Sequence, residues 1–198
     1  YFVHLFETAK TLGELGMGPR TITAGLLHDT VEDCDVTLGE IEERFGEDVA
    51  ELVDVVTKLG KIDYRSEQSK QAQNFQKFIL ATVQDIRVLL VKLSDRLHNM
   101  RTLHFIPKEE SRLRIARETM EIYAPLARRV GLYQLASELE DLSFFHVNPA
   151  ARESIIEKLE ELMSENADDL ERIRFAIKQV IAEQGITARV KGRRKQPY

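Results

Sequence analysis

The chain of 198 residues is long enough for one domain, or one domain and an appendage, with a buried core. Its 43% hydrophobic and 31% charged residues are typical of a soluble globular protein, and no apolar run approaches the roughly 20 residues that cross a bilayer. The net charge of −5 argues against a general nucleic-acid binder, and the single cysteine, Cys34, excludes an internal disulfide and fits a reducing cytoplasm.

Apolar residues recur with helical spacing along almost the whole chain, which predicts an all-α fold. In chain order, we expect helices over about residues 2–15, 19–28 with a continuation into residues 29–33, 38–45, 49–56, 72–82, 85–103, 108–130, 133–144 and 149–184. Residues 60 to 71 are polar and lack an apolar period, so we expect them to be mobile. Ile186 to Val190 is the only strand-like run, and it has no partner strand in the sequence.

Several residues mark where these helices begin, bend and end. Thr37 to Glu40 fits a capping box, and Phe45-Gly46 is expected to end the helix that it opens. Pro125 falls inside a helical pattern and predicts a kink or break there. Asn148-Pro149 is expected to cap one long charged helix, and Gly185 is expected to end it.

The hexad His28-Asp29-Thr30-Val31-Glu32-Asp33 contains one imidazole and three carboxylates. Acidic side chains this close repel one another unless a positive charge lies among them, and imidazole with carboxylate suits Mn²⁺, Fe²⁺ or Zn²⁺. If the preceding helix continues through the hexad, Asp29 and Asp33 share one face and His28 and Glu32 share the adjacent one. Cys34 is expected to be a half-buried thiol and no ligand.

A second constellation spans Lys92 to Thr102 and follows a strongly apolar run. Asp95, Asn99 and Thr102 have i, i+4, i+7 spacing, so one helix face is expected to offer a metal ligand, an amide and a hydroxyl in a row. His4 can supply another imidazole. His98 is expected to point to a different face and to have a structural role.

These residues together resemble the hydrolase domain of the Rel/SpoT family, which makes and destroys the alarmone (p)ppGpp and belongs to the wider HD phosphohydrolase superfamily. The likeness rests on GLLHDTVED, on VTKL from Val56, on KLSDRLHNMRTL from Lys92 and on EIYAPLARRVGL from Glu121. It implies an HD-type helical bundle over residues 1–147, a connector helix over 148–185, and the start of a truncated synthetase domain over 186–198.

The resemblance also implies roles for individual residues. It makes His4, His28, Asp29 and Asp95 the ligands of a Mn²⁺ ion, and Glu32 and Asp33 the catalytic acids. Asn99 and Thr102 become candidates for substrate binding. Lys92 and Arg101 are further candidates, since either side chain could pair with phosphate.

The implied reaction is hydrolysis of ppGpp or pppGpp at the 3′-pyrophosphate, which releases pyrophosphate and GDP or GTP. Water is expected to attack the proximal phosphorus while Glu32 and Asp33 orient and deprotonate it. The implied partner is a synthetase domain in the same full-length chain, whose polyphosphate substrates would explain the basic residues after Arg189. Neither a membrane nor direct nucleic-acid binding is expected.

Two features depart from the family. Leu5 follows His4 where the family usually has proline, and the chain opens at Tyr1 without an initiator methionine, which suggests a fragment lacking a preceding helix and basic loop. Two alternatives stay open: an HD phosphohydrolase that acts on another nucleotide, and a regulatory module that binds nucleotide without turnover. The KLSDRLHNMRT motif argues against the first, and the Glu32–Asp33 pair argues against the second.

Overall fold

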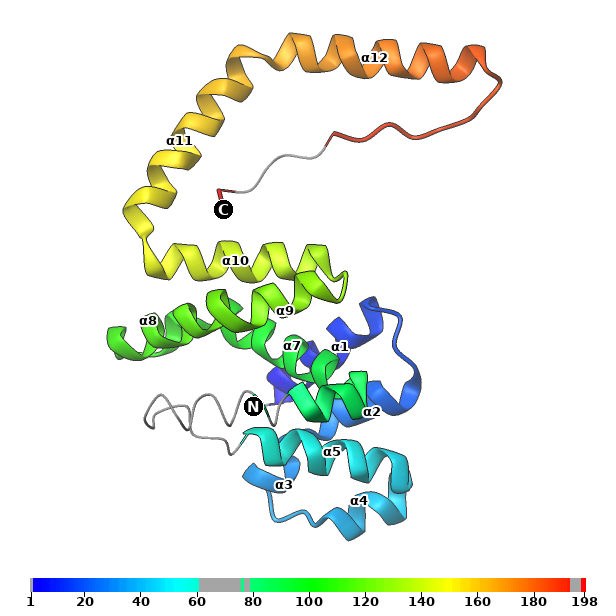
Figure 1. Ribbon diagram of the computed structural model, residues 1–198, viewed down its shortest axis with the longest axis vertical. Coiled ribbons are helices and arrows are strands. Elements are labelled where there is room, and N and C mark those ends of the chain that lie inside the picture. The colour runs from blue at the N-terminus through cyan, green and yellow to red at the C-terminus, as the bar shows by residue number, and fades with distance from the viewer. Residues whose placement is uncertain (1, 61–75, 77–78, 193–196) are drawn as a thin grey trace. The chain divides into compact units, whose positions relative to one another are not determined.

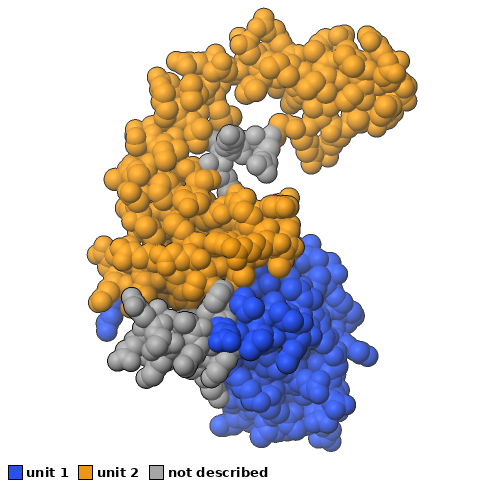
Figure 2. Space-filling view, in the orientation of Figure 1, with its two compact units in different colours: residues 1–108 blue, residues 109–198 orange. Residues whose placement is uncertain are grey.

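The computed structural model describes residues 2–60, 76, 79–192 and 197–198, and all regular secondary structure in these ranges is helical (Figure 1). The chain divides into two compact units, residues 1–108 and 109–198 (Figure 2). Within the described ranges, no helix is both long enough and apolar enough to cross a membrane. The all-α expectation is therefore confirmed.

Unit 1 is built around four helices that pack on one another. Its described elements are α1 (Phe2–Glu14), α2 (Pro19–Leu27), α3 (Thr30–Asp33), α4 (Leu38–Phe45), α5 (Glu47–Gly60), α7 (Ile86–Arg101) and the short 3₁₀ helix η1 (Leu103–Phe105). Helix α1 packs on α2 and α7, α2 also packs on α5 and α7, and α5 packs on α4 and α7. The apolar run of α7 is buried against this group.

A glycine allows α1 and α2 to approach closely. A Cβ atom added to Gly25 would lie 2.4 Å from Cδ1 of Leu12, whose side chain is fully buried. Leu5, Ala9 and Leu12 form the buried stripe of α1, whereas Phe2 is 70% and Phe6 is 51% exposed. Both phenylalanines share the helical spacing of the apolar residues of α1, but they flank the buried face instead of lying on it.

The predicted boundaries of α4 are confirmed. Thr37 and Glu40 form a reciprocal capping box, and Gly46 ends the helix with a φ of 88°, a left-handed conformation that favours glycine. The polar segment over residues 60 to 71 falls outside the described residues except at its first position. Of the helix expected over residues 72–82, only part is described, and there residues 79–84 are helical.

The described residues of unit 2 form six helical segments: α8 (Glu109–Glu118), the π-helix η2 (Thr119–Tyr123), α9 (Ala124–Arg129), α10 (Tyr133–Val147), α11 (Pro149–Glu165) and α12 (Ala167–Glu183). The break predicted at Pro125 is present as the π-helical turn that precedes it. Proline has no N–H to donate to the carbonyl of residue 121. In the turn before it, the backbone hydrogen bonds span five residues instead of four, and the amide of Ala124 donates to the carbonyl of Thr119.

The prediction of one long helix from Asn148 to Gln184 is wrong, because the helix is interrupted at Asn166. The backbone of Asn166 departs from helical geometry (φ −110°, ψ 13°), and its side-chain amide donates to the carbonyl of Leu162 at 2.7 Å. Asp168 and Asp169 then occupy the first turn of α12, where carboxylates are favourable. Asparagine and aspartate favour a new helix start over continuation.

The two ends of this helical pair are as predicted. The side chain of Asn148 accepts from the amide of Ala151 at the start of α11, and Gly185 follows α12 with a φ of 71°. Residues 186–192 have no regular secondary structure. The strand-like run therefore does not form a strand in the described part of the chain, as expected where no neighbouring strand supplies backbone hydrogen bonds.

Candidate metal centre

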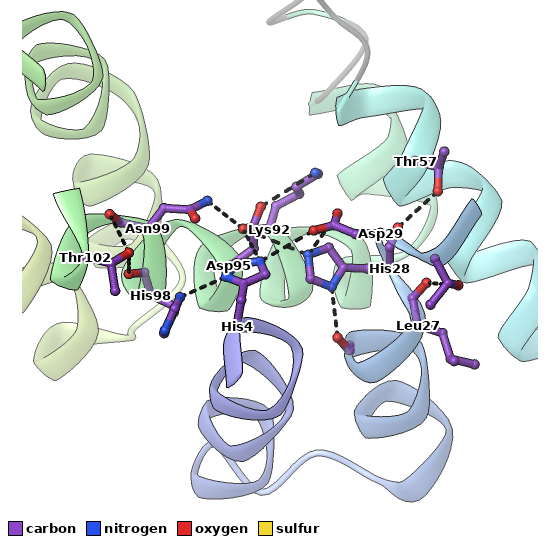
Figure 3. Close-up of polar contacts among 12 residues, drawn as sticks. His4, Leu27, His28, Asp29, Thr57, Lys92, Asp95, His98, Asn99 and Thr102 are labelled. Atoms are coloured by element: carbon purple, nitrogen blue, oxygen red, sulfur yellow. Dashed lines mark hydrogen bonds and ion pairs between the residues drawn. The ribbon is translucent and has the colours of Figure 1, made fainter. Parts of the chain in front are cut away.

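Three helices of unit 1 bring the four predicted ligands to one place (Figure 3). His4 comes from α1, His28 and Asp29 directly follow α2, and Asp95 lies in the middle of α7. Candidate ligand atoms of His4, His28 and Asp29 all lie within 4.8 Å of one another. Oδ1 of Asp95 is 3.3 Å from Nε2 of His4 and 3.9 Å from Nε2 of His28.

The environment of His28 fits a metal ligand. Its side chain is 1% exposed, and Nδ1 lies 2.9 Å from the carbonyl oxygen of Gly25. Since a carbonyl can only accept, Nδ1 carries a proton, which leaves Nε2 as the ring nitrogen that could bind a metal. That Nε2 is buried and makes no hydrogen bond within the described structure, although Oδ1 of Asp29 is 3.1 Å away. A buried lone pair facing carboxylates is what a cation would satisfy.

The chain turns at His28-Asp29, so the expectation of a helix continuing through the hexad is wrong. Helix α2 ends at Leu27 and α3 begins at Thr30. In a continuing helix, the carbonyls of residues 27 and 28 would accept from backbone amides four residues later. Here they accept from hydroxyl groups: Thr30 Oγ1 donates to the carbonyl of Leu27 at 2.7 Å, and Thr57 Oγ1 donates to the carbonyl of His28 at 3.2 Å. Because of this turn, consecutive residues His28 and Asp29 both reach the cluster.

The four side chains are electrostatically coupled. Hydrogen bonds and charge from Asp29 and Asp95 raise the pKa of His4 to about 9. Burial alone would raise the pKa of Asp95, but the hydrogen bond with His4 and the charge of Lys92 outweigh it and hold that pKa below its ordinary value. Nζ of Lys92 lies 3.7 Å from Oδ2 of Asp95. In the metal-free chain the protonated ring of His4 and the ammonium of Lys92 therefore balance the two carboxylates, and a bound cation would take the place of the proton on His4.

The candidate substrate residues on α7 have different surroundings. Asn99 Nδ2 donates to Oδ1 of Asp95 at 2.6 Å, so these two members of the predicted row lie side by side. Thr102 Oγ1 donates to the carbonyl of His98 at 2.9 Å. Arg101 is exposed in the last turn. Lys92, Asn99, Thr102 and Arg101 stay predictions as substrate ligands.

The proposed catalytic acids lie on the short helix directly after the ligand turn. Glu32 and Asp33 are both exposed, and their backbone amides donate to the carbonyl of Asp29 at 3.1 and 2.9 Å. The backbone of Asp29, a candidate ligand, thus accepts hydrogen bonds from the amides of both acids. Cys34 is exposed, which corrects the expectation of a half-buried thiol.

Sequence reasoning misplaced His98 and overlooked Thr57. Nδ1 of His98 lies 2.8 Å from Nδ1 of His4, so His98 contacts the cluster and does not point to a separate face. Its i, i+3 spacing from Asp95 was the available signal, because residues three apart are neighbours on a helix. Burial and the charge of His4 lower the pKa of His98. Thr57 had no local signal, since its role depends on the packing of α5 beside α2.

Comparison with known proteins finds a matching domain profile and relatives that align with the whole chain. The profile described as HD domain matches residues 1–133. GTP pyrophosphokinase rsh of Brucella ovis is 46% identical over 198 residues, which are 100% of this chain and 26% of that protein. The guanosine-3′,5′-bis(diphosphate) 3′-pyrophosphohydrolase of Aquifex aeolicus is 48% identical over 203 aligned positions, 100% of this chain and 28% of that protein. The chain thus spans about a quarter of the length of these relatives.

A solved structure gives the same assignment. It is described as a metazoan ortholog of SpoT that hydrolyzes ppGpp, and it matches with a TM-score of 0.50 and 27% identity over 75% of this chain and 82% of that one. The HD domain match covers more than half of the chain, and Rel/SpoT-family proteins align with all of it. The chain therefore belongs to the HD domain family and matches Rel/SpoT-family proteins along its full length.

Proposed function

We propose that this chain hydrolyses (p)ppGpp at the 3′-pyrophosphate with the help of Mn²⁺ and releases pyrophosphate together with GDP or GTP. The observation that carries the proposal is the convergence of His4, His28, Asp29 and Asp95, in which the buried Nε2 of His28 has no hydrogen-bond partner among the described residues. Two imidazoles and two carboxylates form a ligand set suited to Mn²⁺.

A bound divalent cation would neutralise phosphate oxygens and lower the pKa of water. The chain itself supplies the groups that handle protons. Glu32 and Asp33 are exposed and anchored through their amides to Asp29, so their carboxylates can orient a water molecule beside the ligand turn and accept its proton. Lys92, Arg101 and Asn99 are candidates to hold the phosphate or ribose of the substrate, and Thr102 is a further candidate.

The relatives support the choice of substrate. The Aquifex aeolicus and Vibrio cholerae relatives both carry the name guanosine-3′,5′-bis(diphosphate) 3′-pyrophosphohydrolase. Since this chain spans only part of such proteins, we propose a synthetase domain as the partner of the hydrolase in the full-length protein. We also propose that the hydrolase acts in the cytoplasm.

The test is to incubate the chain with ppGpp and Mn²⁺, with and without a chelator, and to identify the products. We expect GDP and pyrophosphate in the presence of metal and no turnover after chelation. Release of triphosphate from dGTP in place of pyrophosphate from ppGpp would identify an HD phosphohydrolase of another nucleotide. Binding of ppGpp and Mn²⁺ without any GDP would contradict catalysis and support a regulatory module.

A further inference from the structure

Both ring nitrogens of His4 are engaged, in different ways. Nε2 faces the carboxylates, 3.5 Å from Oδ2 of Asp29 and 3.3 Å from Oδ1 of Asp95. Nδ1 faces the opposite way, toward Nδ1 of His98 at 2.8 Å (Figure 3). The two rings are tilted by 62°, with centroids 4.8 Å apart. His98 and Asp95 both belong to α7, so one helix holds His4 from both edges of its ring.

A hydrogen bond between two ring nitrogens can form in only one direction at a time. One Nδ1 must carry the proton and donate it, and the other must accept with its lone pair. If Nε2 of His4 offers its lone pair to a cation, the remaining proton of His4 must lie on Nδ1. His98 then accepts through Nδ1 and carries its own proton on Nε2. The reverse direction would place the proton of His4 on Nε2 and block that ligand.

We propose that His98 is a positioning residue that fixes His4 in the Nδ1-protonated tautomer and holds its ring with Nε2 toward the cation. The inference rests on the metal site of the proposed function, but it does not depend on the substrate. It assigns to His98 the role that the carbonyl of Gly25 has for His28, where Nδ1 lies 2.9 Å from the oxygen. Hydrogen-bond partners of this kind orient ligand histidines and set their tautomer.

The two histidines are held in different ways. Helix α1 begins at Phe2, so His4 lies in the first turn of its helix, and the partners described for its ring are side chains. His28, by contrast, lies at the turn after α2 and is held by its own neighbouring backbone and by Thr57. The bond to His98 ties the start of α1 to α7, from which Asp95 also comes.

The first test is the affinity for Mn²⁺, measured by calorimetry without nucleotide. We expect His98→Leu, which has no acceptor, to lose about 10–100-fold in affinity. We expect His98→Asn to stay close to the wild type, because its carboxamide oxygen can accept from Nδ1 of His4. His104→Leu is the matched control, since His104 is an exposed histidine in η1, and it should bind Mn²⁺ as the wild type does.

The second test reads the tautomers directly. In the wild-type chain loaded with diamagnetic Zn²⁺, long-range ¹H–¹⁵N spectra of the imidazoles should show His4 protonated at Nδ1 and His98 protonated at Nε2. A proton on Nδ1 of His98 would overturn the inference, even if His98→Leu failed to fold.

The outcomes also separate this inference from the proposed function. Unchanged Mn²⁺ affinity in a folded His98→Leu variant would overturn the role of His98 alone. A wild-type chain that binds no Mn²⁺ would overturn both. His98-dependent binding of Mn²⁺ by a chain that leaves ppGpp intact would support the positioning role and contradict the proposed reaction.

Discussion

The helices around the candidate metal centre and the α11–α12 pair use similar apolar residues with opposite results. In α7 alone, eight residues from Val88 to Met100 are buried. Neither α11 nor α12 has a single buried residue, although both carry large apolar side chains. Among these, Leu170 is 53% and Val180 is 60% exposed. Apolar residues with helical spacing therefore predict that a segment is a helix. Whether their side chains are buried depends on the helices that pack against it.

The difference matters for the site because its ligands depend on buried neighbours. The ring of His28 is hydrogen-bonded to the carbonyl of Gly25, and its own carbonyl accepts from Thr57. Asp95 lies on α7, where buried residues both precede and follow it in the sequence. Rigid packing of this kind keeps ligand atoms at fixed distances. No candidate ligand cluster falls among the described residues of the α11–α12 pair.

The largest expected effect comes from a substitution beside the candidate metal centre, and it should lower the rate of hydrolysis without weakening metal binding. Glu32→Gln removes a carboxylate without changing a ligand, so hydrolysis of ppGpp should fall by roughly 10²–10⁴-fold while Mn²⁺ affinity is retained. Glu43→Gln, at an exposed position of α4, is the matched control and should keep the wild-type rate. A Glu32→Gln variant that retains full activity would contradict the assignment of the acid pair.

Matched leucine truncations test the comparison itself. Leu89 in α7 is 1% exposed and Leu170 in α12 is 53% exposed. Leu89→Ala should lower the free energy of unfolding by about 2–5 kcal/mol, whereas Leu170→Ala should change it by less than about 0.5 kcal/mol. Urea denaturation of both variants measures the difference. Equal losses would mean that Leu170 is packed in solution and that the two regions do not differ in this way.

A smaller effect is expected from the glycine that lets α1 approach α2. In Gly25→Ala the new methyl group would meet Cδ1 of buried Leu12 at 2.4 Å, so overpacking should cost about 1–3 kcal/mol of unfolding free energy. Gly39→Ala in α4 is the control, because its nearest atom is 4.0 Å away, and it should gain about 0.4–1 kcal/mol. A Gly25→Ala variant as stable as the wild type would show that Leu12 moves freely.

The charge of the site predicts a gradual dependence of metal binding on pH. His4 has its pKa raised from 6.5 to about 9 in the folded chain, so below that pH a cation must displace its proton. Mn²⁺ affinity should therefore increase with pH by up to about tenfold per unit and level off above about pH 9. Calorimetry in buffers of different ionisation enthalpy should detect release of about one proton near neutral pH. No proton release would contradict a protonated His4 in the metal-free chain.

The sequence predicted what depends on local chemistry. The capping box at Thr37, the break before Pro125 and the turn at Gly185 all follow from the residue at that position and its near neighbours. The convergence of His4, His28 and Asp95 could also be expected, but only because the motifs resemble a known family. Spacing alone does not bring residues from three helices together.

What the sequence missed depends on contacts between distant segments. At the turn of His28-Asp29, the carbonyl of His28 accepts a hydrogen bond from Thr57 of α5, and the partner of His98 is a histidine 94 residues earlier in the chain. The break at Asn166 had a local signal, since an asparagine with two aspartates two and three residues later resembles a helix start, but the helical period on either side of it concealed the interruption. Phe2 and Phe6 are a similar case, because helical periodicity alone does not show which apolar residues of a helix are buried by its neighbours.

The most direct test of the metal centre is a crystal of this chain grown with Mn²⁺ and measured at a wavelength that gives anomalous scattering from manganese. We expect a single strong peak in unit 1, in direct contact with His4, Nε2 of His28, Asp29 and Asp95. A peak elsewhere, such as between the exposed carboxylates of Glu32 and Asp33, or no peak at a saturating Mn²⁺ concentration, would contradict the proposed site.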